Sequence, residues 1–308
     1  MKIACSKIQS ETKFREGGMV FRERLRDVDF VKVVEVLPPK GTNGVEFERR
    51  LIPLKGLVDA FYLPSLQGAV LRASSWGAAL FLQERGFETI FEISCIHRNR
   101  LAIQADLLGV GLLGLQNVML LEGDDPKWGD HPEAEAVRDL GLMELIEAVR
   151  SLKEGKDLAG GDLDGAPDFC VGTKVNASLK DEGLEREWER MREMAERGVE
   201  FFVTTSVYDL GQLERFMLGA SQVGRPVIAG LMVLKSAGMA RYINKHVPGV
   251  LIPEETIDKL LRAPDKAVTS VKIAAETLRG IREVCQGVNI IPIGWEDKVP
   301  QILEEAGI

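Results

Sequence analysis

The 308-residue sequence has few aromatic residues, no excess of positive charge and no long apolar segment. Aromatic residues make up 6% of it and hydrophobic residues 45%, a balance typical of α/β proteins with a large aliphatic core. Its 47 acidic residues outnumber 39 basic ones, and both kinds are interspersed along the chain. Because no basic stripe is available to neutralise a phosphate backbone, we expect no nucleic-acid partner.

The sequence contains no run of about 18 apolar residues, so no segment is long enough to span a bilayer. Its first residues, MKIACSKIQSETKFREGG, become polar after a few positions and lack the apolar core of a signal peptide. These two absences predict a cytoplasmic protein without a membrane segment.

Four widely separated cysteines, Cys5, Cys95, Cys170 and Cys285, form no CxxC pair. This spacing argues against zinc or cluster ligation by this chain alone and against a disulfide framework. We therefore expect no metal site and reduced, mostly buried thiols. This expectation applies least to Cys5, which lies in the N-terminal segment.

Short apolar runs recur along the chain, each followed by a helix-like stretch. They are apolar on both faces, as strands covered on both sides are. The eight predicted strands are 31–37, 57–63, 89–95, 117–121, 168–173, 200–204, 226–232 and 288–293. Eight strand–helix units joined by right-handed crossovers predict a (β/α)₈ TIM barrel of the α/β class. A doubly wound open sheet is the structural alternative.

The segments between the strands indicate how the barrel is elaborated. Amphipathic stretches at 69–85, 184–197, 210–220 and 298–305 predict helices, and 267–284 resembles a long helix before the last strand. Two connections are longer than a minimal unit: 123–139, and 248–267, which contains a short helix. We find no domain linker and expect one domain over residues 1–308, with an N-terminal extension at 1–28 and the barrel from about 29.

Two carboxylates end predicted strands, where barrel active sites lie. Glu35 belongs to an apolar strand, and burial favours the neutral form of a carboxyl group, which suits a general acid. Asp124 directly follows Gly123, whose backbone permits a close approach. The structural alternatives are a hydrogen-bonded rim glutamate for Glu35 and a Gly-Asp-Pro turn for Asp124.

Other polar residues near strand ends are weaker candidates. Arg98 and Arg100 are suited to an anion but also to a solvated helix start, and His131 is a single histidine on a long loop. Lys235 and Arg241 follow the seventh strand, where helix capping is the alternative. No P-loop, HExxH, GxSxG or strand-linked GxGxxG occurs, which argues against nucleotide-binding, zinc-protease and serine-hydrolase classes.

Five segments together resemble the methylenetetrahydrofolate reductase family, especially its short, acetogen-type bacterial form. They are EVLPPKG at 35–41, SCIHRNRLAIQADLLG at 94–109, LEGDDPKWGDHPEAEAV at 121–137, KSAGMARYINKHVPGVLIPEE at 235–255 and IPIGWEDKVPQIL at 291–303. The matches extend over nearly the whole chain from about residue 30. Each segment alone is a weak signal, whereas their combination is specific.

The resemblance implies a TIM barrel whose reduced flavin, usually FAD, passes a hydride to methylenetetrahydrofolate and yields methyltetrahydrofolate. Glu35 would be the proton donor, and Asp124 would lie near flavin and pterin as the second catalytic residue. Cofactor-binding positions would be Glu92, Cys95, Gly123, Asp124, His131, Lys174 and Asn176. Substrate-binding positions would be Thr205, Lys235 and Ala237. Implied partners are a tetrahydrofolate-type pterin, a small zinc-containing subunit and an electron-transfer protein, in an oligomer.

The sequence departs from the family at several ligand contacts. Tyr62-Leu63-Pro64-Ser65 replaces a flavin-contacting threonine stretch, and Glu92 stands in place of histidine or glutamine. Met194 replaces a lysine, Thr205 a glutamine and Ala237 an aromatic residue. FMN, or no flavin, is therefore an alternative to FAD. A flavin-poor relative that acts in methyl transfer, with a corrinoid partner, and a non-catalytic subunit are the alternative functions.

Overall fold

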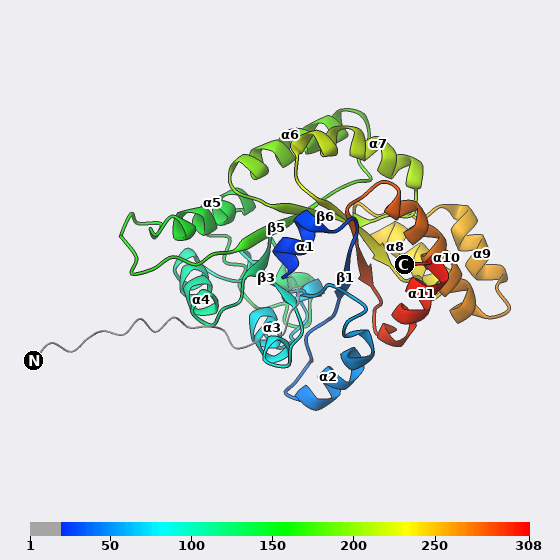
Figure 1. Cartoon of the computed structure of the whole chain (residues 1–308), viewed down its shortest axis with the longest axis horizontal. Helices are drawn as coiled ribbons and strands as arrows, with labels where there is room; N and C mark the ends of the chain where they lie inside the picture. The colour runs from blue at the N-terminus through cyan, green and yellow to red at the C-terminus, as the bar shows by residue number, and fades with distance from the viewer. Residues whose placement is uncertain (1–19) are drawn as a thin grey trace, which may run out of the picture.

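The computed structural model describes residues 20–308, which form a closed barrel of eight parallel strands (Figure 1). Neighbouring strands pair in sequence order, and β8 returns to pair with β1. The strands are β1 Val31–Glu35, β2 Ala60–Leu63, β3 Thr89–Ser94, β4 Asn117–Leu121, β5 Cys170–Val175, β6 Phe201–Ser206, β7 Val227–Met232 and β8 Gly287–Ile291. The closed order confirms the predicted TIM barrel and excludes the open sheet.

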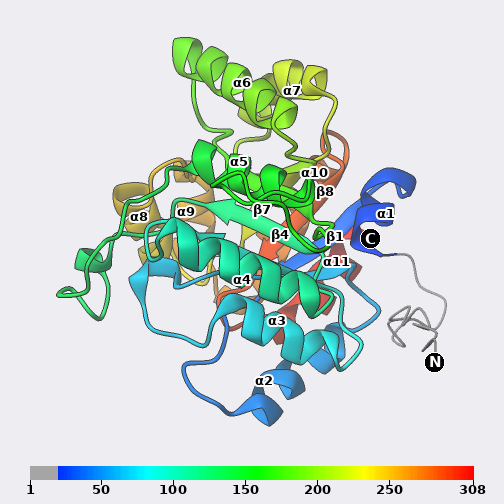
Figure 2. The ribbon, with the colours of Figure 1, turned by 90° about the vertical axis from the view of Figure 1, so that its left-hand side faces the viewer.

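Helices surround the barrel, with α2, α3 and α4 side by side on one flank and α6 and α7 on the opposite one (Figure 2). They are α1 Phe21–Asp27, α2 Gly44–Leu51, α3 Ser75–Gln83, α4 Arg100–Leu112, α5 Leu142–Lys153, α6 Asp181–Glu196, α7 Leu210–Ala220, α8 Ala237–His246, α9 Glu254–Arg262, α10 Lys266–Arg282 and α11 Val299–Ala306. Single 3₁₀ turns lie at Ile52–Leu54, Gln67–Ala69, Pro126–Trp128, Ser221–Val223 and Glu296–Lys298.

Two apolar layers hold the strands, which explains why they are apolar on both faces. One fills the barrel interior and includes Val33, Tyr62, Met119 and Phe201. The other lies between the barrel and its helices, and nearly all of its members are aliphatic or phenylalanine side chains. Burial on both faces of parallel strands gives continuous hydrophobic runs instead of alternation.

Helix α1 covers the amino-terminal end of the barrel, at the opposite end from the long β4–α5 segment (Figure 2). Phe21 is fully buried, and its ring packs edge-on against Phe201 with centroids 5.3 Å apart. Arg22 adds ion pairs to Glu200 and Asp168 at 2.6 and 2.8 Å. The final part of the predicted extension thus closes one end of the barrel, which leaves the carboxyl end for a ligand.

Most of the predicted elements agree with the structure to within a few residues. The helix predicted at 69–85 is shorter, because α3 begins only at Ser75, after the 3₁₀ turn Gln67–Ala69 and an irregular segment. The fourth strand and the helix at 210–220 have the predicted bounds, and the short helix expected within 248–267 is α9. The three cysteines among residues 20–308 are free and buried, as expected, whereas Cys5 lies outside the described residues. No helix within residues 20–308 combines the length and apolar character that crossing a bilayer requires.

Candidate active site

A large cavity, which we call the mouth cavity, opens at the carboxyl end of the barrel with a volume of about 1700 Å³. Its wall includes Glu35 of β1, Glu92 of β3, Asp124 after β4 and Lys174 of β5. Cavities that hold one small molecule usually measure about 300–1000 Å³. The mouth cavity therefore has room for two ligands side by side.

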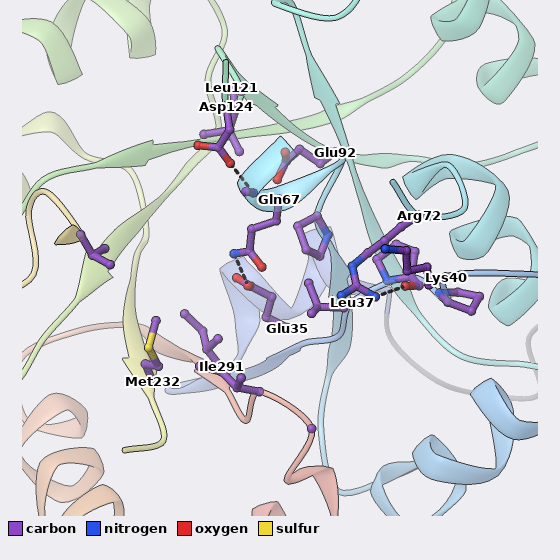
Figure 3. Close-up of a pocket in the computed structure, with 18 of the residues that line it drawn as sticks. Glu35, Leu37, Lys40, Gln67, Arg72, Glu92, Leu121, Asp124, Met232 and Ile291 are labelled. Carbon is purple, nitrogen blue, oxygen red and sulfur yellow. Dashed lines mark hydrogen bonds between the residues drawn. The ribbon is translucent and has the colours of Figure 1, made fainter. Parts of the chain in front are cut away.

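Glu35 is buried at the end of β1, with only 4% of its surface exposed. One carboxylate oxygen accepts a hydrogen bond from Gln67 Nε2 at 3.0 Å, and the other accepts one from Asn289 Nδ2 at 3.3 Å. Asn289 comes from β8, the strand that pairs with β1. The carboxyl group is thus satisfied by two neutral amides and forms part of the cavity wall (Figure 3).

Asp124 is positioned by a tight turn at the end of β4. Gly123 adopts φ +90°, and a Cβ built on it would lie 2.7 Å from Ser94 Cβ, so the turn requires glycine. The Asp124 carboxylate accepts a hydrogen bond from the Gly68 backbone N–H at 2.6 Å. The backbone carbonyl oxygen of Asp124 accepts a hydrogen bond from His97 Nε2 at 2.9 Å. Hydrogen bonds therefore hold both the side chain and the backbone of Asp124.

His97 connects the ends of β3 and β4. Since Nε2 donates to the Asp124 carbonyl, Nδ1 is left to accept from the Ser94 hydroxyl at 3.1 Å. Burial lowers the pKa of His97, which favours this neutral form. The residue acts as a structural support for Asp124.

Glu92, which lines the mouth cavity, forms a buried pair with Tyr62. The Tyr62 hydroxyl donates a hydrogen bond to Glu92, and Lys174 Nζ lies 5.4 Å from the centre of the Tyr62 ring. Burial raises the pKa of Glu92 to about 7, although Lys174, the Tyr62 hydroxyl and a backbone bond from Ser65 act in the opposite direction. Burial and the nearby carboxylates raise the pKa of Tyr62 well above its usual value.

The structure brings five of the predicted site residues together in the wall of the mouth cavity. These are Glu35, Glu92, Gly123, Asp124 and Lys174. The other described candidates, Cys95, His131, Asn176, Thr205, Lys235 and Ala237, are not part of the wall.

The structure places these candidates in other surroundings. His131 is 62% exposed and hydrogen-bonds Asp130, while Asn176 accepts hydrogen bonds from Ser178 and, at 3.5 Å, from Thr205. Lys235 Nζ lies 5.1 Å from the centre of the Trp295 ring. Cys95 and Ala237 are buried.

Sequence reasoning missed Gln67, Arg72, His97 and Asn289. Asn289 offered a usable signal, because it is a polar residue inside an apolar strand, like Glu35. Gln67 and Arg72 belong to the irregular β2–α3 segment, where no periodic pattern marks which side chains turn inward. Within residues 20–308, no group of three or more His, Cys, Asp or Glu side chains is arranged to hold a metal ion.

Comparison of structures places the fold among known barrels. A protein from Clostridium thermocellum that binds two copies of 5-methyl-5,6,7,8-tetrahydrofolic acid superposes with a TM-score of 0.60 at 13% identity, covering 94% of this chain and 98% of that one. An oxaloacetate acetylhydrolase superposes with a TM-score of 0.53 at 12% identity, covering 93% and 86%. At these identities the likeness establishes the fold alone.

Comparison of sequences is more specific. Methylenetetrahydrofolate reductase 2 of Schizosaccharomyces pombe is 22% identical over an alignment of 296 residues that covers 89% of this chain and 45% of that protein. The chain thus spans about half the length of this relative. The family model for methylenetetrahydrofolate reductase matches residues 20–307. With this match over nearly its whole length, the chain belongs to the methylenetetrahydrofolate reductase family.

Proposed function

We propose that this chain is a flavin-dependent methylenetetrahydrofolate reductase, which reduces methylenetetrahydrofolate to methyltetrahydrofolate. The observation that carries the proposal is the placement of Glu35 and Asp124 in the wall of one cavity at the carboxyl end of a barrel. Family membership and the tetrahydrofolate-binding structural neighbour support a folate-type pterin as the substrate.

In the proposed reaction, Glu35 is the proton donor. Its carboxyl group gives a proton to a nitrogen of the five-membered ring of the substrate, and the ring opens to an iminium ion. Hydrogen bonds from two neutral amides hold the carboxyl group without supplying a permanent counter-charge. General acid catalysis requires a group held within reach of the proton that it transfers, and these bonds orient the carboxyl group at the cavity wall.

Asp124 is the proposed electrostatic partner of that step. The iminium ion carries a positive charge, and a fixed carboxylate at the cavity wall stabilises it. Because the Gly68 and His97 hydrogen bonds already hold Asp124, little reorganisation accompanies the appearance of this charge.

A flavin fits the mouth cavity by size and by available groups. The volume leaves room for a flat cofactor beside a pterin. Lys174 forms no ion pair within 4.0 Å with a carboxylate of residues 20–308. Its ammonium group is therefore available to the polar edge of the flavin ring or to a flavin phosphate. Asp124 and Lys174 would hold the cofactor, which when bound supplies the hydride. We propose FAD, as the family resemblance implies.

The electron source is proposed to be a separate electron-transfer protein, because the sequence lacks a nicotinamide-binding fingerprint. A small zinc-containing subunit and an oligomeric assembly belong to the same proposal, and both rest on the resemblance. Co-purification from the native host tests them, and a monomer active with free reduced nicotinamide would contradict them.

The visible spectrum of the purified protein tests the flavin. We expect a stoichiometric flavin band that reductant bleaches and methylenetetrahydrofolate restores, with methyltetrahydrofolate formed in equal amount. Mass spectrometry of the released cofactor separates FAD from FMN. A protein that contains and binds no flavin would contradict the proposal.

A second candidate is a flavin-poor, pterin-binding methyltransferase or accessory subunit. The observation that favours it is the Tyr62–Glu92 pair, because these side chains bond each other at positions where the family resemblance implies flavin contacts. A colourless protein that binds methyltetrahydrofolate and passes its methyl group to a corrinoid would support this candidate.

A further inference from the structure

Arg72 carries a positive charge that no carboxylate of residues 20–308 neutralises. The residue lies in the β2–α3 segment, forms part of the mouth cavity wall and reaches toward the residues that follow β1 (Figure 3). One guanidinium nitrogen donates a hydrogen bond to the Pro38 carbonyl at 3.2 Å, while Nε is buried with no hydrogen-bond partner. Among residues 20–308, no carboxylate forms an ion pair with it within 4.0 Å.

The other cations of the cavity wall have different surroundings. Lys40 pairs with Asp130 at 2.9 Å, Arg50 with Glu296 at 3.8 Å and Arg190 with Glu187 at 2.7 Å. Lys174 lies over the Tyr62 ring, and its charge lowers the pKa of Glu92. Arg72 is therefore the guanidinium of this wall that has an unsatisfied buried donor and no counter-charge among the described residues.

An unsatisfied, half-buried guanidinium is costly unless an anion completes it. Arginine is also the side chain best suited to a carboxylate, because its planar fork donates two parallel hydrogen bonds. Pro38, Pro39 and Pro64, which also line this wall, have no backbone N–H to offer a ligand. Arg72 is thus the cation on this side of the cavity that no carboxylate of residues 20–308 engages.

We propose that Arg72 binds a carboxylate of the glutamate tail of the folate substrate. The inference rests on the proposed function and adds to it the orientation of the folate in the mouth cavity. The pterin lies beside Glu35 and Asp124, and the tail runs past the segment that follows β1. A flavin phosphate has the same anionic chemistry, but the proposed flavin contacts at Asp124 and Lys174 belong to β4 and β5, whereas Arg72 lies against the residues after β1.

The test compares two ligands by calorimetry: 5-methyltetrahydrofolate, which has the glutamate, and 6-methyltetrahydropterin, which lacks it. In Arg72→Gln we expect the affinity for the folate to fall by about 10- to 100-fold, as loss of a charge-assisted hydrogen bond implies. The affinity for the tail-less pterin and the flavin content should stay unchanged. Arg262→Gln is the matched control, because Arg262 is 81% exposed and pairs with Asp258 within α9, and neither residue lines the mouth cavity.

Three results would overturn the inference: unchanged folate affinity, an equal loss for both ligands, or a loss of flavin alone. Arg72→Lys keeps the charge but not the fork, so it should give a smaller, folate-selective loss and serves if the glutamine variant does not fold. A wild-type protein that binds neither ligand would instead contradict the proposed function. Equal binding of both ligands by the wild type would contradict the subsite alone.

Discussion

Glu35 and Asp124, the two proposed catalytic carboxylates, are held by adjacent residues of one loop. Gln67 donates its side-chain amide to Glu35 at 3.0 Å, and the backbone N–H of Gly68 donates to Asp124 at 2.6 Å. In Figure 3, Gln67 lies between the two carboxylates. The flanking Leu66 and Ala69 adopt φ of 47° and 52°, a left-handed backbone that costs about 1 kcal/mol or more at each residue. The β2–α3 loop therefore couples the acid to its electrostatic partner.

Gln67→Ala should lower turnover because the Glu35 carboxyl group loses one of the two amides that orient it. We expect kcat to fall about tenfold, with a smaller change in KM, since misorientation of a reacting group acts mainly on the chemical step. Steady-state kinetics check this result. Gln222→Ala is the matched control, because Gln222 is exposed and bonds only within its own helical turn. Equal kinetics for the two variants would remove Gln67 from the positioning role.

Glu92 should make stability depend on pH. Burial raises its pKa to about 7 from 4.5, so the folded protein binds this proton more tightly than the unfolded chain. The stabilisation is complete below the unfolded value and is lost as the pH rises through the folded one. Between those two pH values the wild type should lose roughly 3 kcal/mol that Glu92→Gln keeps.

Denaturant unfolding at about pH 5 and about pH 8 measures this difference. Glu304→Gln is the control, because Glu304 is exposed on α11 and does not line the mouth cavity. If Glu92→Gln follows the same pH dependence as the wild type, Glu92 is ionised throughout the range and the buried pair is described wrongly.

Gly123→Ala should be more harmful than the same change at another glycine with positive φ. A Cβ at Gly123 would meet Ser94 Cβ at 2.7 Å and Ile96 Cγ2 at 2.9 Å, whereas a Cβ at Gly165, at φ +98°, meets nothing within 4 Å. Both variants carry backbone strain, but only Gly123→Ala adds overpacking of about 1–3 kcal/mol. Urea unfolding and turnover of both variants check this prediction. Similar losses in both would show that the β4 turn tolerates a side chain.

The sequence could predict the barrel because its strands have a strong physical signature. Strands buried between an interior layer and surrounding helices are apolar at most positions on both faces, and the sequence contains eight such runs. Glu35 was detectable for the same reason, as a charged residue inside an apolar run. Asp124 was detectable because the glycine before it marks a close backbone approach.

Contacts that depend on irregular segments could not be predicted. Phe21 belongs to a short helix in a polar N-terminal region, and only the barrel geometry reveals that it closes the interior. The Tyr62–Glu92 hydrogen bond joins residues 30 positions apart on different strands. Its existence follows from the β2–β3 register, which pairs Tyr62 with Ile90 and which no local pattern encodes.

The most direct measurement of the central claim is the turnover of Glu35→Gln with methylenetetrahydrofolate. Glutamine preserves the shape of the side chain, so folding, measured by thermal denaturation, and pterin affinity should be retained. The proton donor is lost, and we expect kcat to fall by about 100- to 10,000-fold. Turnover equal to that of the wild type would contradict the assignment of Glu35 as the acid and with it the proposed mechanism.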